Sequence, residues 1–491
     1  MLTGTSYAGI DIGTSGVKAI LMDGNGKLLA ESSAPLEISR PHPGWSEQDP
    51  EHWWAATLAA VDALAKAEPE AMSRLGGLGL SGQMHGATLL DASDRVLRPA
   101  ILWNDVRSSE ECAELEAACP RLREITGNIA MPGFTAPKLQ WVRKHEPHIF
   151  ERVARVLLPK DYVRLRLTGE NVSDMSDAAG TLWLDVAARD WSDEALAATG
   201  LTRGNMPSLV EGSAPGGTLL PALRQRWGMA NRVTVAGGGG DNAASACGIG
   251  AVRPGQGFVS LGTSGVLFVS NDRFRPNTLG AVHAFCHAIP QTWHQMGVIL
   301  SATDSLNWLA GLVGKDAAQL SVAAEAGFSG PGEEIFLPYL SGERTPHNSA
   351  TARGSLVGLS HVSTPARLAQ AVMEGVGFAF RDCQRVLRDA GTDIDRLVAV
   401  GGGSRSNLWL RIIATNLDMP MEVPRDGDFG GAFGAARLGL CAAEGADPMQ
   451  VCTMPPIERV VEPDRDLASA YDAQYARFRA LYPAIEGARS A

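Results

Sequence analysis

The sequence of 491 residues lacks several patterns that would assign a function class at once. It has no Gly-x-x-x-x-Gly-Lys-Ser/Thr motif, which excludes a P-loop nucleotide site. Its seven cysteines form no Cys-x-x-Cys pair, so we expect reduced thiols in a cytoplasmic protein. No apolar run is long enough to cross a bilayer. No basic segment leads into an apolar one at the start, so we also expect no signal peptide.

Positive charge is also scarce relative to negative charge. The formal net charge is −11 and the pI is near 5.5, so the chain carries no global basic footprint for nucleic acid. Apolar residues make up 45% and charged residues 20%, as in ordinary globular proteins. The length predicts two domains or more. Because the net charge is negative, an anionic ligand would have to be held by local groups such as backbone N–H nests, helix N-termini or a metal ion.

One short pattern occurs twice, roughly half the chain apart. Residues 8–20 and 257–269 both read as an apolar strand, then Gly-Thr-Ser-Gly-Val, then a second apolar strand. Internal repeats are sought first in any sequence, and this period is far too long for a solenoid. The repeat predicts a duplicated domain whose two hairpins face a shared cleft.

A Gly-Thr-Ser-Gly turn suits phosphate, because its glycines let successive N–H groups point into one concavity. The hydroxyls of Thr14, Ser15, Thr263 and Ser264 add donors. A single such turn could be an ordinary hairpin connection, but two matching copies favour a nucleotide clamp. The first copy also carries Asp11 and Lys18. Asp11 fits a Mg²⁺ ligand, direct or through water, although an Asp that only bonds its own turn is the alternative.

The order of predicted elements in the first 80 residues indicates the fold. Strands at 8–12, 17–22 and 28–32 precede a helix at about 51–67 and a strand at 75–80. That order predicts an α/β protein of two ribonuclease-H-like domains, of the actin and hexokinase type, around a central cleft. Gly77, Gly79 and Gly82 spell a dinucleotide fingerprint, but they lie within the predicted strand, which argues against a Rossmann site.

Two further segments place polar or small residues after predicted strands. Asp241 follows four glycines and could take the proton of a substrate hydroxyl during phosphoryl transfer, or it could simply cap the next helix. Residues 401–403, all glycine, form a strand–turn–helix connection that could bind adenosine or serve only as a tight turn. His85 could bind a polyol or be structural. His283, Cys286 and His287 have the spacing of a helical zinc site, but the segment reads as extended chain, which disfavours zinc.

Together these residues resemble the FGGY family of carbohydrate kinases, and within it the bacterial members that act on xylulose. The Asp-x-Gly-Thr-Ser-x-x-Lys opening at 11–18 and the signature at 133–145 match the family pattern. Further matches are Gly-Asp-Asn at 240–242, Gly-Thr-Ser-Gly at 262–265, Gly-Glu-Arg-Thr-Pro at 342–346 and the glycine turn at 401–403. The similarity covers nearly the whole chain.

The resemblance implies ATP-dependent phosphorylation of D-xylulose to D-xylulose 5-phosphate and ADP, with Mg²⁺ as cofactor. It makes Asp241 the general base and Asp11 the metal-linked carboxylate. The implied sugar-binding residues are Met84, His85, Trp103, Asp241 and Asn242. The implied ATP-binding residues are Thr14, Ser15, Lys18, Gly262, Thr263, Gly402, Gly403 and Asn407.

We expect residues 1–247 to form the N-terminal domain with the sugar site and base, and residues 248–491 the ATP-binding C-terminal domain. Two alternatives remain. The first is a kinase for another sugar or polyol, such as ribulose or gluconate, and the second is a non-kinase ATPase of the actin type. The expected partners are the sugar and ATP, with neither nucleic acid nor membrane, and the sequence leaves room for a homodimer.

Overall fold

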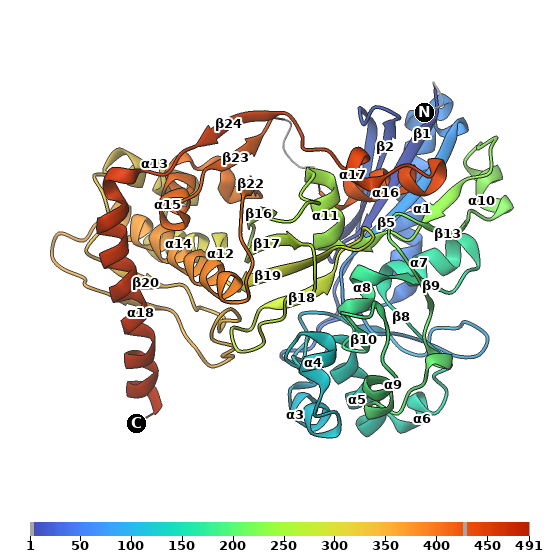
Figure 1. Cartoon of the computed structure of the whole chain (residues 1–491), viewed down its shortest axis with the longest axis horizontal. Coiled ribbons are helices and arrows are strands. Elements are labelled where there is room, and N and C mark those ends of the chain that lie inside the picture. Colours follow the sequence, from blue (N-terminus) through green and yellow to red (C-terminus); the bar gives the residue numbers. More distant parts are fainter. Residues whose placement is uncertain (1–3, 426–429, 491) are drawn as a thin grey trace.

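The computed structural model describes residues 4–425 and 430–490. Two α/β lobes lie side by side, each built on one large mixed sheet (Figure 1). Most of the first half of the chain forms one lobe, and most of the second half forms the other. The predicted α/β class with two domains is therefore confirmed.

The first sheet runs in the order β13-β14-β5-β1-β2-β3, with β15 pairing with β5. β1, β2 and β3 are antiparallel neighbours, whereas β5 is parallel to β1 and β14 is parallel to β5. This is the strand order of a ribonuclease-H-like unit, as predicted. The strands are β1 (Ser6–Ile12), β2 (Gly16–Asp23), β3 (Leu28–Pro35), β5 (Leu75–Gly82), β13 (Pro215–Thr218), β14 (Thr234–Ala236) and β15 (Gly239–Gly240).

The second sheet repeats this arrangement, in the order β18-β19-β17-β16-β22-β23-β24. β16, β17 and β19 are antiparallel neighbours, and β22 and β23 continue the sheet in parallel to β16. The strands are β16 (Gln256–Leu261), β17 (Gly265–Asn271), β18 (His283–Cys286), β19 (Trp293–Ile299), β22 (Arg396–Val400), β23 (Met421–Pro424) and β24 (Ile457–Val461). His283 and Cys286 therefore lie on a strand, which removes the helical spacing that a zinc site there would need.

Most of a long insertion between β5 and β14 forms the lower part of the first lobe in Figure 1, whereas its end returns to the first sheet as β13. Its short helices enclose a separate apolar cluster that also contacts the second sheet through Phe285 and Met296. The insertion thus forms one wall of the junction between the lobes. Its main helices are α3 (Ser109–Ala118), α4 (Leu122–Thr126), α5 (Thr135–His145), α7 (Pro159–Thr168), α8 (Met175–Ala179), α9 (Asp193–Ala198) and α10 (Pro221–Arg226).

Helices cover the sheets of both lobes. In the first lobe, α1 (Pro50–Ala67) packs on β2 and β3, close to its predicted bounds. In the second lobe, the predicted long amphipathic helix is α14 (Pro365–Asp389), and it packs against α12, α13, α15 and β19. The other helices of this lobe are α12 (Thr303–Val313), α13 (Ala317–Ala326), α15 (Asn407–Leu417) and α18 (Ala468–Ser490). No helix in the described ranges is both long and apolar enough to cross a membrane.

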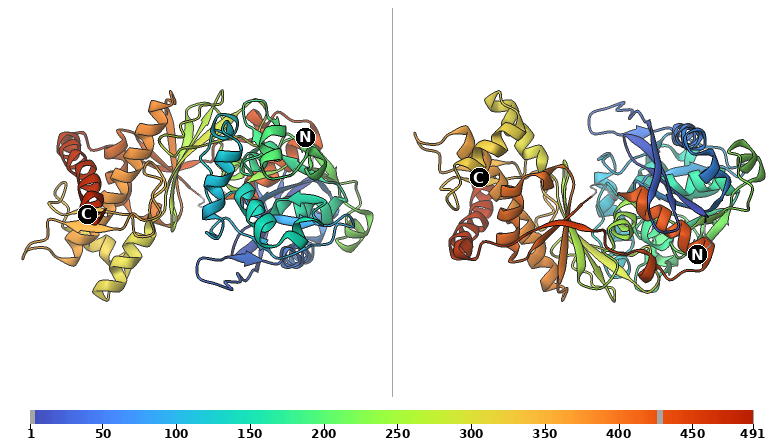
Figure 2. Two further views of the ribbon diagram at one scale, coloured as in Figure 1. Left: turned by 90° about the horizontal axis from the view of Figure 1, so that it is seen from below. Right: turned by 90° about the horizontal axis from the view of Figure 1, so that it is seen from above.

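One helix from the second half of the chain belongs to the first lobe. α16 (Gly431–Glu444) packs on β1, β5 and β14 and against α11 (Asp241–Ile249), beside the blue strands in Figures 1 and 2. A Cβ at Gly79 would overlap the carbonyl oxygen of Ala435, and a Cβ at Gly9 would overlap that of Ala432. Gly77 and Gly79, two of the three glycines that spell the false dinucleotide fingerprint, therefore allow a helix backbone to lie directly on the sheet.

The predicted domain boundary after residue 247 falls inside α11. The chain then passes from α11 to β16, from β23 back to α16, and from α17 (Pro448–Val451) out to β24. Because residues of the second half complete the first lobe, a division into 1–247 and 248–491 describes the chain order more closely than the packing. The division itself stays a prediction.

Candidate sugar and nucleotide site

The first Gly-Thr-Ser turn joins β1 to β2 and is held by side chains from three other segments. Gln48 Nε2 donates to the Thr14 carbonyl oxygen at 2.7 Å. Thr14 Oγ1 donates to Gln83 Oε1 at 3.1 Å and accepts from Trp103 Nε1 at 3.0 Å. Ser15 remains exposed at the tip. The turn is therefore fixed from behind while its tip faces solvent.

The second turn, between β16 and β17, is held by the start of α12. Thr303 N donates to the Gly262 carbonyl oxygen at 3.0 Å, and Ala302 N donates to that of Thr263 at 2.8 Å. The glycine turn after β22 lies against the same strand, because a Cβ at Gly403 would come within 2.8 Å of Leu261 Cβ. The structure thus brings the predicted nucleotide residues Gly262, Thr263, Gly402 and Gly403 together.

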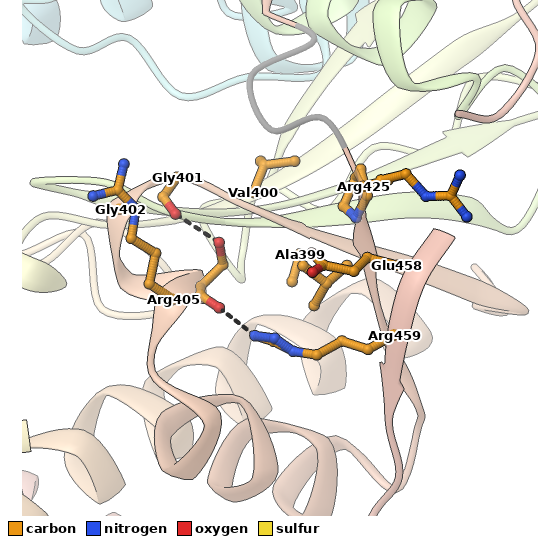
Figure 3. Close-up of a pocket in the computed structure, with 11 residues that line it drawn as sticks. Ala399, Val400, Gly401, Gly402, Arg405, Arg425, Glu458 and Arg459 are labelled. Carbon is orange, nitrogen blue, oxygen red and sulfur yellow. Dashed lines mark hydrogen bonds between the residues drawn. The ribbon is translucent and has the colours of Figure 1, made fainter. Parts of the chain in front are cut away.

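A cavity of about 410 Å³ opens beside the glycine turn (Figure 3). Gly402 lines it together with arginines from three segments, and Arg459 donates to the Ser404 carbonyl oxygen at 3.1 Å. Gly403 is buried beneath the turn, whereas Asn407 is exposed at the first position of α15 and is not among the described lining residues. Of the three adenosine-side predictions, only Gly402 faces this cavity.

A second cavity, of about 420 Å³, contains Asp11 and Lys18 from the facing strands of the first hairpin. Lys18 Nζ forms an ion pair with Glu31 Oε2 at 3.1 Å. The N-terminus of α16 forms the opposite wall, and a Cβ at Gly431 would lie 3.0 Å from Asp11 Oδ1. The absence of a side chain at Gly431 therefore gives the Asp11 carboxylate its room, and the helix N-terminus favours its negative charge.

Asp241 is the first residue of α11, and Gly240 occupies the N-cap position. The Asp241 carboxylate accepts hydrogen bonds from Asn242 N at 2.8 Å and from Asn242 Nδ2 at 2.9 Å. Burial, followed by the negative charge of Asp11, raises the pKa of Asp241 to about 6. At neutral pH the group is ionised and accepts a proton more readily than an ordinary aspartate. Asp241 is therefore not the N-cap residue of this helix, although its carboxylate accepts one N–H of the first turn.

The segment leading to Asp241 is anchored by buried polar groups of the insertion. Arg164 donates to the carbonyl oxygens at residues 236 and 237. Ser176 Oγ accepts from Gly240 N at 3.1 Å, and Ser176 N donates to Asp174 Oδ2 at 2.7 Å. Because these groups are buried, they fix the backbone that presents Asp241.

His85 lies in a small cavity between the lobes, of about 40 Å³. Its Nδ1 lies 2.6 Å from the Gly180 carbonyl oxygen, which can only accept, so Nδ1 carries the proton and Nε2 can accept a hydrogen bond. Burial lowers the pKa of His85 to about 3, so the ring stays neutral. Lys138 Nζ donates to the His85 carbonyl oxygen at 2.8 Å and holds the residue in its left-handed conformation, φ 72°. Lys138 thereby gives the signature at 133–145 a structural role.

The same cavity includes one further predicted residue, Trp103, and several that the sequence did not single out. The lining residues are His85, Trp103, Met131, Gly133, Phe134, His283 and Arg344. Met84 is buried next to it, since a Cβ at Gly180 would lie 2.7 Å both from Met84 Cε and from His85 Nδ1. His283 and Arg344 come from the second lobe. The motif at 342–346 was a signal for Arg344, but no local pattern places it beside His85.

Comparison with known proteins gives matches over nearly the whole chain. The model of the FGGY family of carbohydrate kinases, N-terminal domain, matches residues 6–248, and that of the C-terminal domain matches residues 257–443. A xylulose kinase of Escherichia coli (strain K12) is 51% identical over 478 residues, 97% of this chain and 98% of that protein.

Two solved structures are similar in fold and sequence. The crystal structure of a xylulose kinase from Brucella ovis has a TM-score of 0.97 and 58% identity, covering 98% of this chain and 99% of that one. The xylulose kinase of Rhodospirillum rubrum has a TM-score of 0.91 and 31% identity, with the same coverage of both chains.

Proposed function

The chain belongs to the FGGY family of carbohydrate kinases, and we propose that it transfers the γ-phosphoryl group of ATP to the 5-hydroxyl of D-xylulose. The products are D-xylulose 5-phosphate and ADP. One structural observation carries the proposal: an ionisable base, Asp241, lies near Asp11 and directly follows Gly240, which packs against Met84 beside a hydrogen-bond acceptor for a sugar, His85. The identity of about half of all residues to xylulose kinases supports this choice of sugar.

In this reaction Asp241 is the general base. Its carboxylate takes the proton of the 5-hydroxyl, the O5–Pγ bond forms, and the bond from Pγ to the β-phosphate oxygen breaks, leaving ADP. The raised pKa of about 6 supports the role, since base catalysis is most efficient when the pKa lies near the working pH. Met84, Asn242 and Trp103 complete the proposed sugar site.

The nucleotide phosphates are held between the two hairpin turns. Thr14, Ser15 and Lys18 of the first lobe and Gly262 and Thr263 of the second supply the donors, and Gly402, Gly403 and Asn407 bind the adenosine side. The rigid support behind both turns favours this role, because a preorganised donor costs little to order on binding.

Asp11 is the proposed link to Mg²⁺. Within residues 4–425 and 430–490, no three His, Cys, Asp or Glu side chains surround one ion position. A single carboxylate at the end of a strand nevertheless fits Mg²⁺, which binds through few protein groups and keeps waters and phosphate oxygens as ligands. When bound, the ion neutralises charge on the transferring phosphoryl group.

The test is a coupled assay of ADP formation with D-xylulose, ribulose, gluconate and glycerol. We expect the highest kcat/KM with D-xylulose and a requirement for Mg²⁺. A higher kcat/KM with ribulose or gluconate would show that this sugar, and not D-xylulose, is the substrate. ATP hydrolysis independent of every sugar would support the non-kinase ATPase.

We also propose a cytoplasmic location, because all seven cysteines are free and buried in the described structure, as suits a reducing compartment. A homodimer, for which the sequence leaves room, is tested by light scattering of the purified chain. A mass of one chain at micromolar concentration would refute it.

A further inference from the structure

Arg344 reaches the sugar cavity from the second lobe on a firmly anchored backbone. Glu343 Oε1 accepts from Arg344 N at 2.7 Å and from Leu300 N at 3.1 Å. On the other side, Thr345 N donates to the Val298 carbonyl oxygen at 3.0 Å. Residues on both sides of Arg344 are thus fixed to the end of β19, so the arginine has little freedom except in its own side chain.

The Arg344 side chain is aimed by His283. Arg344 Nη1 lies 3.2 Å from His283 Nε2. A guanidinium can only donate, so His283 Nε2 accepts and its proton resides on Nδ1, which lies 3.0 Å from Asn128 Oδ1. Asn128 Nδ2 in turn donates to the Ala284 carbonyl oxygen at 3.0 Å, which fixes the orientation of the amide. Burial, followed by the charge of Arg344, lowers the pKa of His283 well below its usual value, so the ring stays neutral.

The guanidinium is therefore only partly used by the protein. It has five N–H donors, and within the described residues the bond to His283 is the one hydrogen bond that its side chain makes. Arg344 lines the cavity together with His85 and Trp103. The cavity thus presents an acceptor, His85 Nε2, and a group that only donates, the Arg344 guanidinium.

His85 Nε2 and the Arg344 guanidinium suit one end of an open-chain ketose, namely the end opposite the 5-hydroxyl that receives the phosphoryl group. Because Asp241 is the proposed base for the 5-hydroxyl and is not among the described residues that line the cavity, we assign the cavity to the opposite end of the sugar. D-xylulose closes its furanose ring through O5, so the form with a free 5-hydroxyl also has a free C2 carbonyl. A carbonyl oxygen can accept two N–H bonds from the guanidinium, whereas a hydroxyl in its place also has to direct its own proton to another acceptor.

We propose that Arg344 binds the C2 carbonyl oxygen of the sugar and determines the preference for a ketose over the corresponding polyols. His283 and Asn128 are positioning residues that aim the guanidinium. The inference rests on the proposed function, since it assumes that a ketose enters this cavity.

The test compares D-xylulose with its two reduction products, xylitol and D-arabinitol, in the wild type, Arg344→Gln, Arg344→Lys and His283→Phe. Arg344→Gln, whose amide both donates and accepts, should lower kcat/KM for D-xylulose roughly 10- to 100-fold, the usual effect of losing a bond to a charged group. It should leave the polyols nearly unchanged, so the ketose-to-polyol ratio collapses. Arg344→Lys, which still only donates, should keep most of the ratio, and His283→Phe should reduce it.

Arg353→Met is the matched control, because Arg353 is exposed and bonds only to carbonyl oxygens of residues 350 and 352 in the described structure. Its ratio should equal that of the wild type. A thermal shift with ATP shows that each variant is folded. An unchanged ketose-to-polyol ratio in a folded Arg344→Gln overturns the inference, whereas a wild type that phosphorylates no ketose overturns the proposed function instead.

Discussion

Trp103 Nε1 donates a hydrogen bond of 3.0 Å to Thr14 Oγ1 and so connects the wall of the cavity at His85 to the first Gly-Thr-Ser turn. The Thr14 hydroxyl donates a hydrogen bond to Gln83 Oε1, and Gln83 Nε2 donates to Gln48 Oε1 at 2.8 Å. A bound sugar that moved Trp103 would therefore also change the hydrogen bonding of Thr14, in the turn that we assign to phosphate.

A double-mutant cycle of Trp103→Phe and Thr14→Val measures this connection. Each single change should lower kcat/KM, and the double variant should lose less than the sum, with a coupling of about 1 kcal/mol for one hydrogen bond. The measurement is kcat/KM for D-xylulose at saturating Mg-ATP. Losses that add fully would mean that the two groups act independently.

Asp241→Asn should lower kcat about 10²- to 10⁴-fold, because the amide cannot take the proton of the 5-hydroxyl. Nucleotide affinity should stay close to that of the wild type, since Asp241 bonds only to Asn242 among the described residues. Steady-state kinetics and a thermal shift with ATP give the two quantities. Near-normal turnover in this variant would exclude Asp241 as the base.

Asp11→Asn should raise the Mg²⁺ concentration needed for half-maximal activity about 10-fold or more, because a neutral amide is a weaker ligand for a hard cation. The KM for the sugar should change far less. A titration of activity with Mg²⁺ at fixed ATP and sugar checks both values. Equal changes in the two would point to a general disturbance of the hairpin.

Glu374 gives a pH dependence of stability that is separate from catalysis. Its buried carboxylate accepts from Gln370 Nε2 at 2.8 Å and from Tyr471 OH at 3.2 Å, and burial raises its pKa from 4.5 to about 7. The folded state thus binds the proton more tightly than the unfolded state. This contribution is fully present below pH 4.5 and is lost as the pH rises through 7.

Glu374→Gln removes this titration and keeps a side chain that can accept from Gln370 and Tyr471. The Tm of the variant minus that of the wild type should therefore increase between about pH 5 and pH 8. Thermal unfolding at a series of pH values measures the difference. A difference that does not change with pH would refute a raised pKa at this position.

Gly79→Ala should destabilise the protein by roughly 2–4 kcal/mol, because the added methyl group would overlap the Ala435 carbonyl oxygen and push α16 off the sheet. Gly311→Ala is the matched control. No described atom lies within 4 Å of a Cβ at Gly311, and alanine is favoured over glycine in a helix by about 0.5–1 kcal/mol. Urea unfolding should therefore give a lower free energy of unfolding than the wild type for Gly79→Ala and a higher one for Gly311→Ala.

The twin hairpins and the sheet order could be predicted because they depend on local patterns: apolar alternation, glycine turns and the repeat itself. Thr14, Thr263 and Gly402 were predicted as nucleotide residues from the same local patterns, and that role stays a prediction. His283, Phe134 and Arg344 were missed as parts of the proposed sugar site because they meet only through packing between segments far apart in the sequence. Lys138 was part of a matched signature, but its bond to the His85 carbonyl oxygen depends on how α5, which carries Lys138, packs against a segment 53 residues earlier in the chain.

The position of α16 has a consequence for how the chain is made. β1 and β5 leave the ribosome early, yet the face that α16 covers stays open until residues near 444 have been synthesised. At roughly 5–20 residues per second, that interval lasts on the order of half a minute. A flat surface of glycine-rich strands remains exposed throughout, so the nascent first lobe is a natural client for chaperones, and truncation before α16 should yield insoluble protein.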